Sequence, residues 1–168
     1  MPTTKDYLLQ EYANVFLGIG TLPGGPYRIQ LKEGYKPVQH PPYHVAISLK
    51  PPYKAGLERL TELGVIKEVR EHTEWINSIV PVKKPDGSFW LCLDPKHLNQ
   101  AMKRNQWYSR TVDDIPPELA DSKYFSLHDS KSGYWHVPLD KESNFLATFN
   151  TPWGKYRWLR LPFVAETL

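Results

Sequence analysis

Apolar positions that recur about every 3.6 residues predict two main helices. The first lies within 1–17, where tyrosine, leucine, valine and phenylalanine side chains fall near one stripe. The second runs from about Lys54 to Leu63 and carries leucines on one face. Gly64 follows it directly, and glycine is common just past the end of a helix. A shorter helix is predicted after Asp94, with Asp94 as its N-cap and Pro95 at its first position.

Apolar and polar residues that alternate with a period of two predict strands elsewhere. Residues 78–82 are an apolar run, and in 89–93 apolar residues alternate with Trp90 and Cys92. Pro85-Asp86-Gly87 lies between these runs and is a turn signal, which predicts a β-hairpin. In the C-terminal part, strands are predicted at 124–128, 135–139, 145–149 and 156–159, with a turn at 151–154. Helices and strands mix without a regular alternation, which predicts an α+β fold.

Prolines and glycines interrupt the segments between these elements. The chain has 16 prolines, and those in 36–52 predict an extended arm with little regular structure. A glycine-rich loop at 18–25 and a short strand at 27–31 are predicted ahead of the arm. A helix is also predicted near Thr111, and we expect it to be short because Pro116-Pro117 follows.

Length and composition are those of one globular domain. The 168 residues are 40% hydrophobic and 23% charged, with a formal net charge of +3 and no long charged run. This balance neither indicates nor excludes a nucleic-acid partner, because basic patches form in space. The single cysteine, Cys92, excludes an internal disulfide and favours an intracellular location, cytoplasmic or nuclear. No membrane partner is expected, since no apolar run approaches about 20 residues and the N-terminus lacks a signal-peptide pattern.

Three blocks of the chain, taken in order, resemble gypsy-type LTR-retrotransposon (Metaviridae) reverse transcriptases. Residues 65–107, with WINSIVPVKKPDG followed by CLDPKHLN, resemble the fingers, and FSLHDSKSGYWHVPLD at 125–140 resembles motif A of the palm. TFNTPWGKYRWLRLPF at 148–163 resembles the approach to motif B, and the proline-rich stretch at 27–43 resembles the segment ahead of the fingers. The resemblance therefore covers most of the chain.

The resemblance implies a fold and a division of the chain. It implies an α+β fold with a reverse-transcriptase-like fingers subdomain and an incomplete palm. The expected parts are an N-terminal helix and proline-rich arm in 1–52, a fingers-like region in 53–122 and a partial palm in 123–168.

The resemblance also implies roles for single residues. Asp129 takes the place of the motif A aspartate, which in the family is a catalytic ligand of Mg²⁺, an ion that prefers oxygen. Tyr134 takes the place of the aromatic residue beneath the nucleotide sugar, and Phe163 begins motif B in the nucleotide site. Lys83 and Lys84 resemble fingertip lysines that approach the triphosphate. Read without the family, Asp129 is a turn cap, Tyr134 a core residue, and the lysines solvated side chains on a hairpin.

Three departures from the family pattern weaken the expectation of catalysis. Trp90 stands where the family has an arginine, whose forked guanidinium grips phosphates. Val164 stands where motif B continues with a glycine. No Tyr-x-Asp-Asp hairpin follows in the sequence, so the resemblance implies a truncation before the remaining metal-binding aspartates. With Asp129 as one ligand of three, Mg²⁺ is expected for the family but no functional cofactor is expected here.

Three functions remain open at this point. The first is a retrotransposon-derived, domesticated fragment of the RNA-directed DNA polymerase family, inactive alone and retaining RNA or DNA binding. The second is a co-opted protein–protein interaction module, which uses exposed palm sheet surface to bind a protein partner or to self-associate. The third is part of an active reverse transcriptase, completed by a second chain or a further C-terminal segment.

Overall fold

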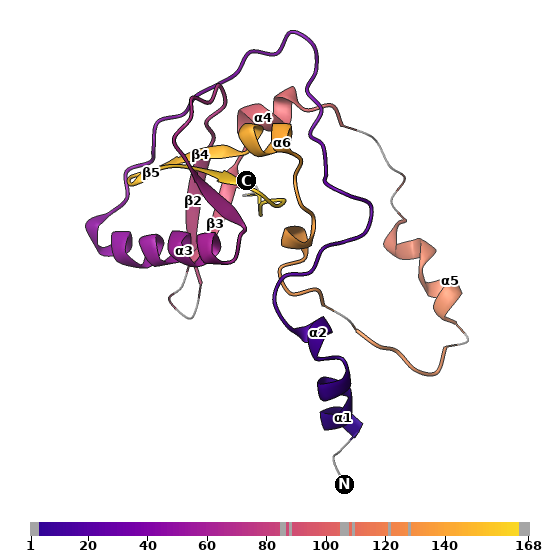
Figure 1. The fold of residues 1–168 in the computed structure, drawn as a ribbon. Helices are drawn as coiled ribbons and strands as arrows, with labels where there is room; N and C mark the ends of the chain where they lie inside the picture. Colours follow the sequence, from indigo (N-terminus) through magenta and orange to yellow (C-terminus); the bar gives the residue numbers. More distant parts are fainter. Residues whose placement is uncertain are drawn as a thin grey trace.

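The computed structural model describes residues 4–84, 87, 89–104, 108, 110–120, 122–127 and 129–164. In this part of the chain, short helices surround two small antiparallel sheets (Figure 1). The helices α1 and α2 and the helix α5 lie away from the sheets (Figure 1). The predicted α+β class is confirmed.

The first sheet joins the middle of the chain to its C-terminal part. Its strand order is β1 (Ile66–Val69), β5 (Gly154–Trp158) and β4 (Thr148–Thr151). β4 and β5 form a hairpin around Pro152 and Trp153, as the turn prediction required. β1 was not predicted, because its sequence IKEV offers only two apolar residues, and these become buried by pairing with β5.

The second sheet is the hairpin of β2 (Ser78–Lys83) and β3 (Phe89–Asp94), and it confirms the hairpin prediction. Alternate residues of β3 are buried, while Trp90 between them is 49% exposed. The predicted turn residues Pro85 and Asp86 lie outside the described residues. Gly87 has a φ of 83°, a backbone conformation that glycine adopts without strain.

Helix α3 (Lys50–Glu62) packs on β1 and β3 and places three buried side chains in the main core: Tyr53, Leu57 and Leu60. It begins four residues before the predicted start, because Pro51 and Pro52 fit its first turn, where the missing N–H groups cost little. Leu63, predicted on the apolar stripe, is exposed. Gly64 has a φ of 65° just past the helix end, as predicted.

The proline-rich arm lies extended across the molecule from the region of α2 to α3 (Figure 1). The predicted strand at 27–31 forms only isolated bridges, between Tyr27 and Leu139 and between Leu31 and Met102. Farther along, Gln39 bridges to Ile76. These partners lie in segments far apart in the sequence, so residues 27–39 join the region of Ile76 and Met102 to the region of Leu139.

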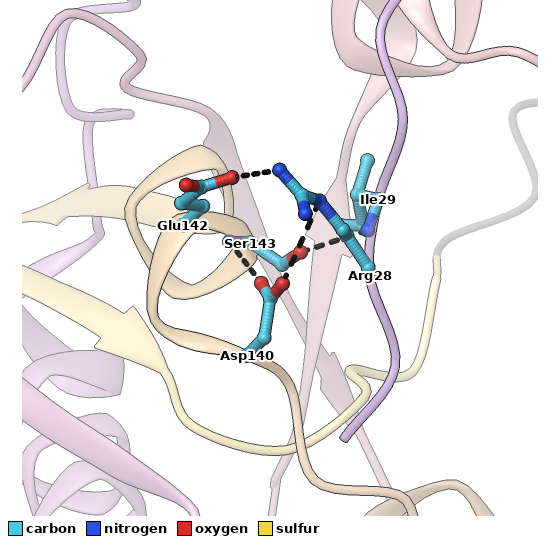
Figure 2. Close-up of polar contacts among 5 residues, drawn as sticks. All are labelled: Arg28, Ile29, Asp140, Glu142 and Ser143. Atoms are coloured by element: carbon cyan, nitrogen blue, oxygen red, sulfur yellow. Dashed lines mark hydrogen bonds and ion pairs between the residues drawn. The ribbon is translucent and has the colours of Figure 1, made fainter. Parts of the chain in front are cut away.

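Helix α6 (Lys141–Leu146) fastens the arm at its centre and was not predicted. The Asp140 carboxylate caps this helix by accepting the Ser143 N–H at 2.7 Å, and the Ser143 hydroxyl accepts the Ile29 N–H at 2.7 Å (Figure 2). Arg28 reaches both the Asp140 carboxylate, at 3.9 Å, and the Glu142 carboxylate, at 2.6 Å (Figure 2). The sequence prediction gave a strand at 145–149; only 148–149 is extended, because the cap at Asp140 starts a helix that ends at Leu146.

Several local predictions near helix ends were wrong. Asp94 is not an N-cap: it is the last residue of β3, paired with Ser78, and Pro95 takes the cap position of α4 (Lys96–Ala101). The N-terminal helix is two helices, α1 (Thr4–Glu11) and α2 (Ala13–Phe16). Near Thr111 a 3-10 helix (Val112–Asp114) precedes the short α5 (Pro116–Leu119), and prolines occupy the first turn of α5 as they do in α3.

Two predicted C-terminal strands also differ. Residues 122–127 form no regular secondary structure and belong to neither sheet, and His128 lies outside the described residues. Residues 135–139 begin in a 3-10 helix (Gly133–His136) and then make single bridges at Pro138 and Leu139. The 156–159 prediction is confirmed in β5 up to Trp158.

Candidate functional site

A surface hollow of about 650 Å³ brings together three of the residues singled out in the sequence: Asp129, Tyr134 and Phe163. Asp129 lies in the loop ahead of the 3-10 helix Gly133–His136, which carries Tyr134. Phe163 comes from the extended segment after β5. The rest of the lining consists of small or aliphatic residues, two of them serines with a hydroxyl group: Ser130, Ser132, Gly133, Val137 and Leu161.

Ring contacts fix the two aromatic residues of the hollow. The Phe163 ring lies edge-on to Tyr134 at 5.2 Å and to the buried Trp135 at 5.7 Å between centroids. The Leu93 N–H donates to the Phe163 carbonyl at 2.8 Å, which joins this segment to β3. Tyr134 is therefore half exposed and lines the hollow, where its ring contacts Phe163, and it is not a core residue.

Ser132 is a residue of the hollow that sequence reasoning missed. Its φ of 56° lies in the left-handed region, which non-glycine residues rarely adopt. The turn at Ser132 starts the 3-10 helix and so sets the direction of Tyr134. A serine between Lys131 and Gly133 carries no sequence signal for this conformation.

Asp129 is exposed at the edge of the hollow and is the only carboxylate among the described lining residues. Two-metal chemistry needs several carboxylates to hold ions roughly 3.5–4 Å apart. No group of three or more His, Cys, Asp or Glu side chains gathers anywhere in the described ranges. These residues therefore do not form a Mg²⁺ site by themselves, and no catalytic step through a metal follows from them.

The two predicted fingertip lysines do not line this hollow. Lys83 and Lys84 lie at the end of β2, beside the hairpin turn. The Lys84 ammonium sits 4.9 Å from the centroid of the Trp90 ring, a cation–π contact. Trp90 thus occupies the outward face of the hairpin instead of the core.

Val164 lines a neighbouring apolar hollow of about 310 Å³ that shares Tyr134 and Leu161 with the first. It forms a bridge to Leu93 and is half exposed. A glycine here would leave more open space beside the backbone, so the Val164 side chain reduces the space in this neighbouring hollow. Its isopropyl group adds to the apolar lining, which includes Leu98 and Met102 from the α4 region.

The side chains outside the hollow include three whose pKa is shifted: Asp140, Asp114 and Cys92. Hydrogen bonds from the Ser143 hydroxyl and amide hold the pKa of the Asp140 carboxyl below its usual value. The Thr111 amide and hydroxyl lower the pKa of Asp114 in the same way. Burial raises the pKa of the Cys92 thiol, which disfavours the reactive thiolate.

The chain is similar in sequence to parts of viral and retrotransposon polyproteins. No family model matches the chain. It is 35% identical over 89 residues to the retrovirus-related Pol polyprotein from transposon 412 of Drosophila melanogaster, covering 51% of this chain and 7% of that protein. It is 27% identical over 137 residues to the enzymatic polyprotein of Cauliflower mosaic virus (strain D/H), covering 80% of this chain and 20% of that one. The chain therefore spans a fifth or less of these two relatives.

Solved structures of foamy virus protease-reverse transcriptase have the same fold as this chain. The native crystal structure of prototype foamy virus protease-reverse transcriptase matches 94% of this chain and 21% of its own, with a TM-score of 0.77 and 25% identity. The chain is similar to the reverse-transcriptase region of Pol polyproteins. Foamy viral protease-reverse transcriptases in complex with dsDNA and with an RNA/DNA hybrid match with TM-scores of 0.76 and 0.72. At 24% and 20% identity, these two matches show the fold alone.

The reverse-transcriptase-like fold explains why the hollow forms where it does. Asp129 and Tyr134 meet Phe163, about 30 positions farther along the chain, because β4 and β5 reverse the chain between them. In the described part of the chain, no helix has both the length and the apolar character needed to cross a membrane.

Proposed function

We propose that this chain is the fingers and the N-terminal part of the palm of a gypsy-type reverse transcriptase, which binds RNA–DNA or DNA duplex but does not polymerise nucleotides by itself. The proposed division places the N-terminal helix and the proline-rich arm in 1–52, the fingers in 53–122 and the partial palm in 123–168. The observation that carries the proposal is the hollow shared by Asp129, Tyr134 and Phe163.

Two further features support a nucleic-acid ligand. The β2–β3 hairpin carries Lys83 and Lys84 at its outer end, where cationic side chains suit phosphate groups. Structures of the same fold from foamy virus contain dsDNA and an RNA/DNA hybrid. Phosphate contacts supply most sequence-independent affinity, so binding by this chain is expected to depend strongly on salt.

The proposal that this chain alone is inactive rests on the number of metal-binding carboxylates in the hollow. Asp129 supplies one carboxylate, whereas a pair of divalent ions requires several. Mg²⁺ is the metal expected for the family, and Asp129 is the one residue of the hollow suited to it.

A primer-extension assay with Mg²⁺ or Mn²⁺ on an RNA template, run beside a duplex-binding assay, tests the proposal. We expect binding without extension. Extension that is abolished by Asp129→Asn would overturn the claim of inactivity and favour the third function, an active enzyme completed by another segment. Absence of duplex binding at about 50 mM salt would overturn the claim of nucleic-acid binding.

A protein-interaction role is the second candidate, and one observation favours it. The segment before Asp129 belongs to neither sheet and exposes large apolar side chains, with Tyr124 93% and Leu127 99% exposed. Exposed apolar surface of this kind favours contact with a protein partner or a second copy of the chain. Concentration-dependent self-association, measured by sedimentation in the absence of duplex binding, would support this candidate over the first.

A further inference from the structure

The outward face of the β2–β3 hairpin carries an exposed aromatic ring that the core does not use. Trp90 pairs across the hairpin with Val82, and both side chains are exposed. The flanking residues Phe89 and Leu91 point the other way and are buried. A tryptophan ring on a projecting hairpin leaves apolar surface in water, which is unfavourable unless the ring has a partner.

Lys84 supplies that partner. Successive side chains of a strand point to opposite faces, so Lys84 shares the Trp90 face whereas Lys83, paired with Phe89, points to the other. The Lys84 ammonium lies 4.9 Å from the Trp90 ring centroid. In the part of the chain that the structure describes, no ion pair joins Lys84 to a carboxylate. Among the described residues, the Trp90 ring is therefore the charge-orienting contact of the Lys84 ammonium.

We propose that Trp90 is a positioning residue, whose ring holds the Lys84 ammonium at the outer end of the hairpin where it binds a phosphate group. An ammonium resting on a ring face keeps N–H donors that point away from the ring, and three donors on a point charge suit phosphate oxygens. The phosphate belongs either to a nucleic-acid backbone or to a nucleoside triphosphate. This inference rests on the proposed function and deepens it.

Position 90 is the place where the resemblance implies an arginine and this chain has a tryptophan. An arginine there would provide the charge itself, whereas Trp90 provides an uncharged surface that places the charge of Lys84. A tryptophan that only filled space would affect binding independently of Lys84. A tryptophan that acts through Lys84 loses its effect when the ammonium is absent.

A double-mutant cycle on the whole chain separates these cases. The variants are Trp90→Leu, Lys84→Gln and the pair, and the probes are a fluorescein-labelled RNA–DNA hybrid and dATP, each titrated at low salt. We expect Lys84→Gln to weaken binding of at least one probe, and Trp90→Leu to weaken the same probe by about threefold, the scale of an exposed cation–π contact. In the Lys84→Gln background, Trp90→Leu should have no further effect. The probe that responds identifies the source of the phosphate.

Two further variants control the cycle. Trp90→Phe keeps an aromatic ring and should retain most of the binding affinity. Retained affinity in Trp90→Phe, beside lost affinity in Trp90→Leu, would show that the ring matters and that the loss is not caused by misfolding. Lys83→Gln removes the neighbouring charge on the opposite face, and its effect should add to that of Trp90→Leu.

Each remaining outcome contradicts the inference in a recognisable way. If Trp90→Leu weakens binding equally with and without Lys84, the ring itself contacts the ligand. If Lys84→Gln weakens binding and Trp90→Leu does not, or if Lys84→Gln has no effect, the positioning role is wrong while the proposed function stands. If the unaltered chain binds neither probe, the proposed function fails and the inference fails with it.

Discussion

Replacing Ser143 by alanine should loosen the segment around Ile29 from helix α6. Ser143 is 0% exposed, and its hydroxyl accepts the Ile29 N–H at 2.7 Å (Figure 2). Its own N–H still donates to Asp140 in the variant, so the cap of α6 remains. The substitution therefore removes the acceptor of the Ile29 N–H and the hydrogen bond from the hydroxyl to the Asp140 carboxylate, and it keeps the backbone cap.

The expected cost follows from the group left without a partner. A buried donor that loses its acceptor costs about 1–3 kcal/mol. Ile29 is only partly buried, so water offsets some of this cost, and we expect about 2 kcal/mol of lost unfolding free energy. For a chain of this size that loss corresponds to a Tm lower by about 4–8 °C.

Thermal denaturation and amide hydrogen exchange measure the two parts of this prediction. The Ile29 amide should exchange faster in Ser143→Ala, together with its neighbours in the arm, while amides of α3 change only with global stability. Ser126→Ala makes the same chemical change at an exposed position and should leave Tm within about 1 °C. An unchanged Tm with unchanged Ile29 exchange would refute the role assigned to Ser143.

The remaining predictions concern a buried amide, a helix cap and the exposed aspartate. Asn77→Ala should destabilise the fold by about 3 kcal/mol in denaturant unfolding, because its amide, 3% exposed as a residue, donates to the carbonyls of Leu146 and Thr148. The pKa of Asp140 is lowered, so its contribution is complete above the usual carboxyl value and is lost as pH falls through the lowered one. Unfolding free energies of the unaltered chain and Asp140→Asn should therefore converge in acid, and a constant difference would contradict this. Asp129→Asn should leave Tm nearly unchanged because the side chain is exposed, and a large drop would instead identify Asp129 as a structural cap.

Local signals in the sequence predicted those elements whose partners are close along the chain. The β2–β3 hairpin needs only the alternation in 89–93 and a turn signal, and both are local. Helix α3, which ends just before Gly64, likewise follows from leucine spacing and a glycine. The resemblance to reverse transcriptases gave Asp129, Tyr134 and Phe163, which the structure places around one hollow.

Elements that depend on distant partners could not be predicted in this way. β1 has a weak strand pattern and exists because Ile66 pairs with Trp158. α6 depends on the Asp140 cap and on Ser143, whose partner Ile29 is 114 positions away. The contact between Lys84 and Trp90 requires the strand register, which fixes which side chains share a face.

The salt dependence of RNA–DNA hybrid binding tests the central claim most directly. Affinity measured from about 50 to 200 mM salt should fall linearly on a log–log plot, because phosphate contacts release counterions. If the hybrid is the probe that responds to Lys84→Gln, this substitution should make the slope shallower by about one. No binding at the lowest salt, or an affinity that does not change with salt, would contradict the account of this chain as a nucleic-acid-binding, reverse-transcriptase-like region.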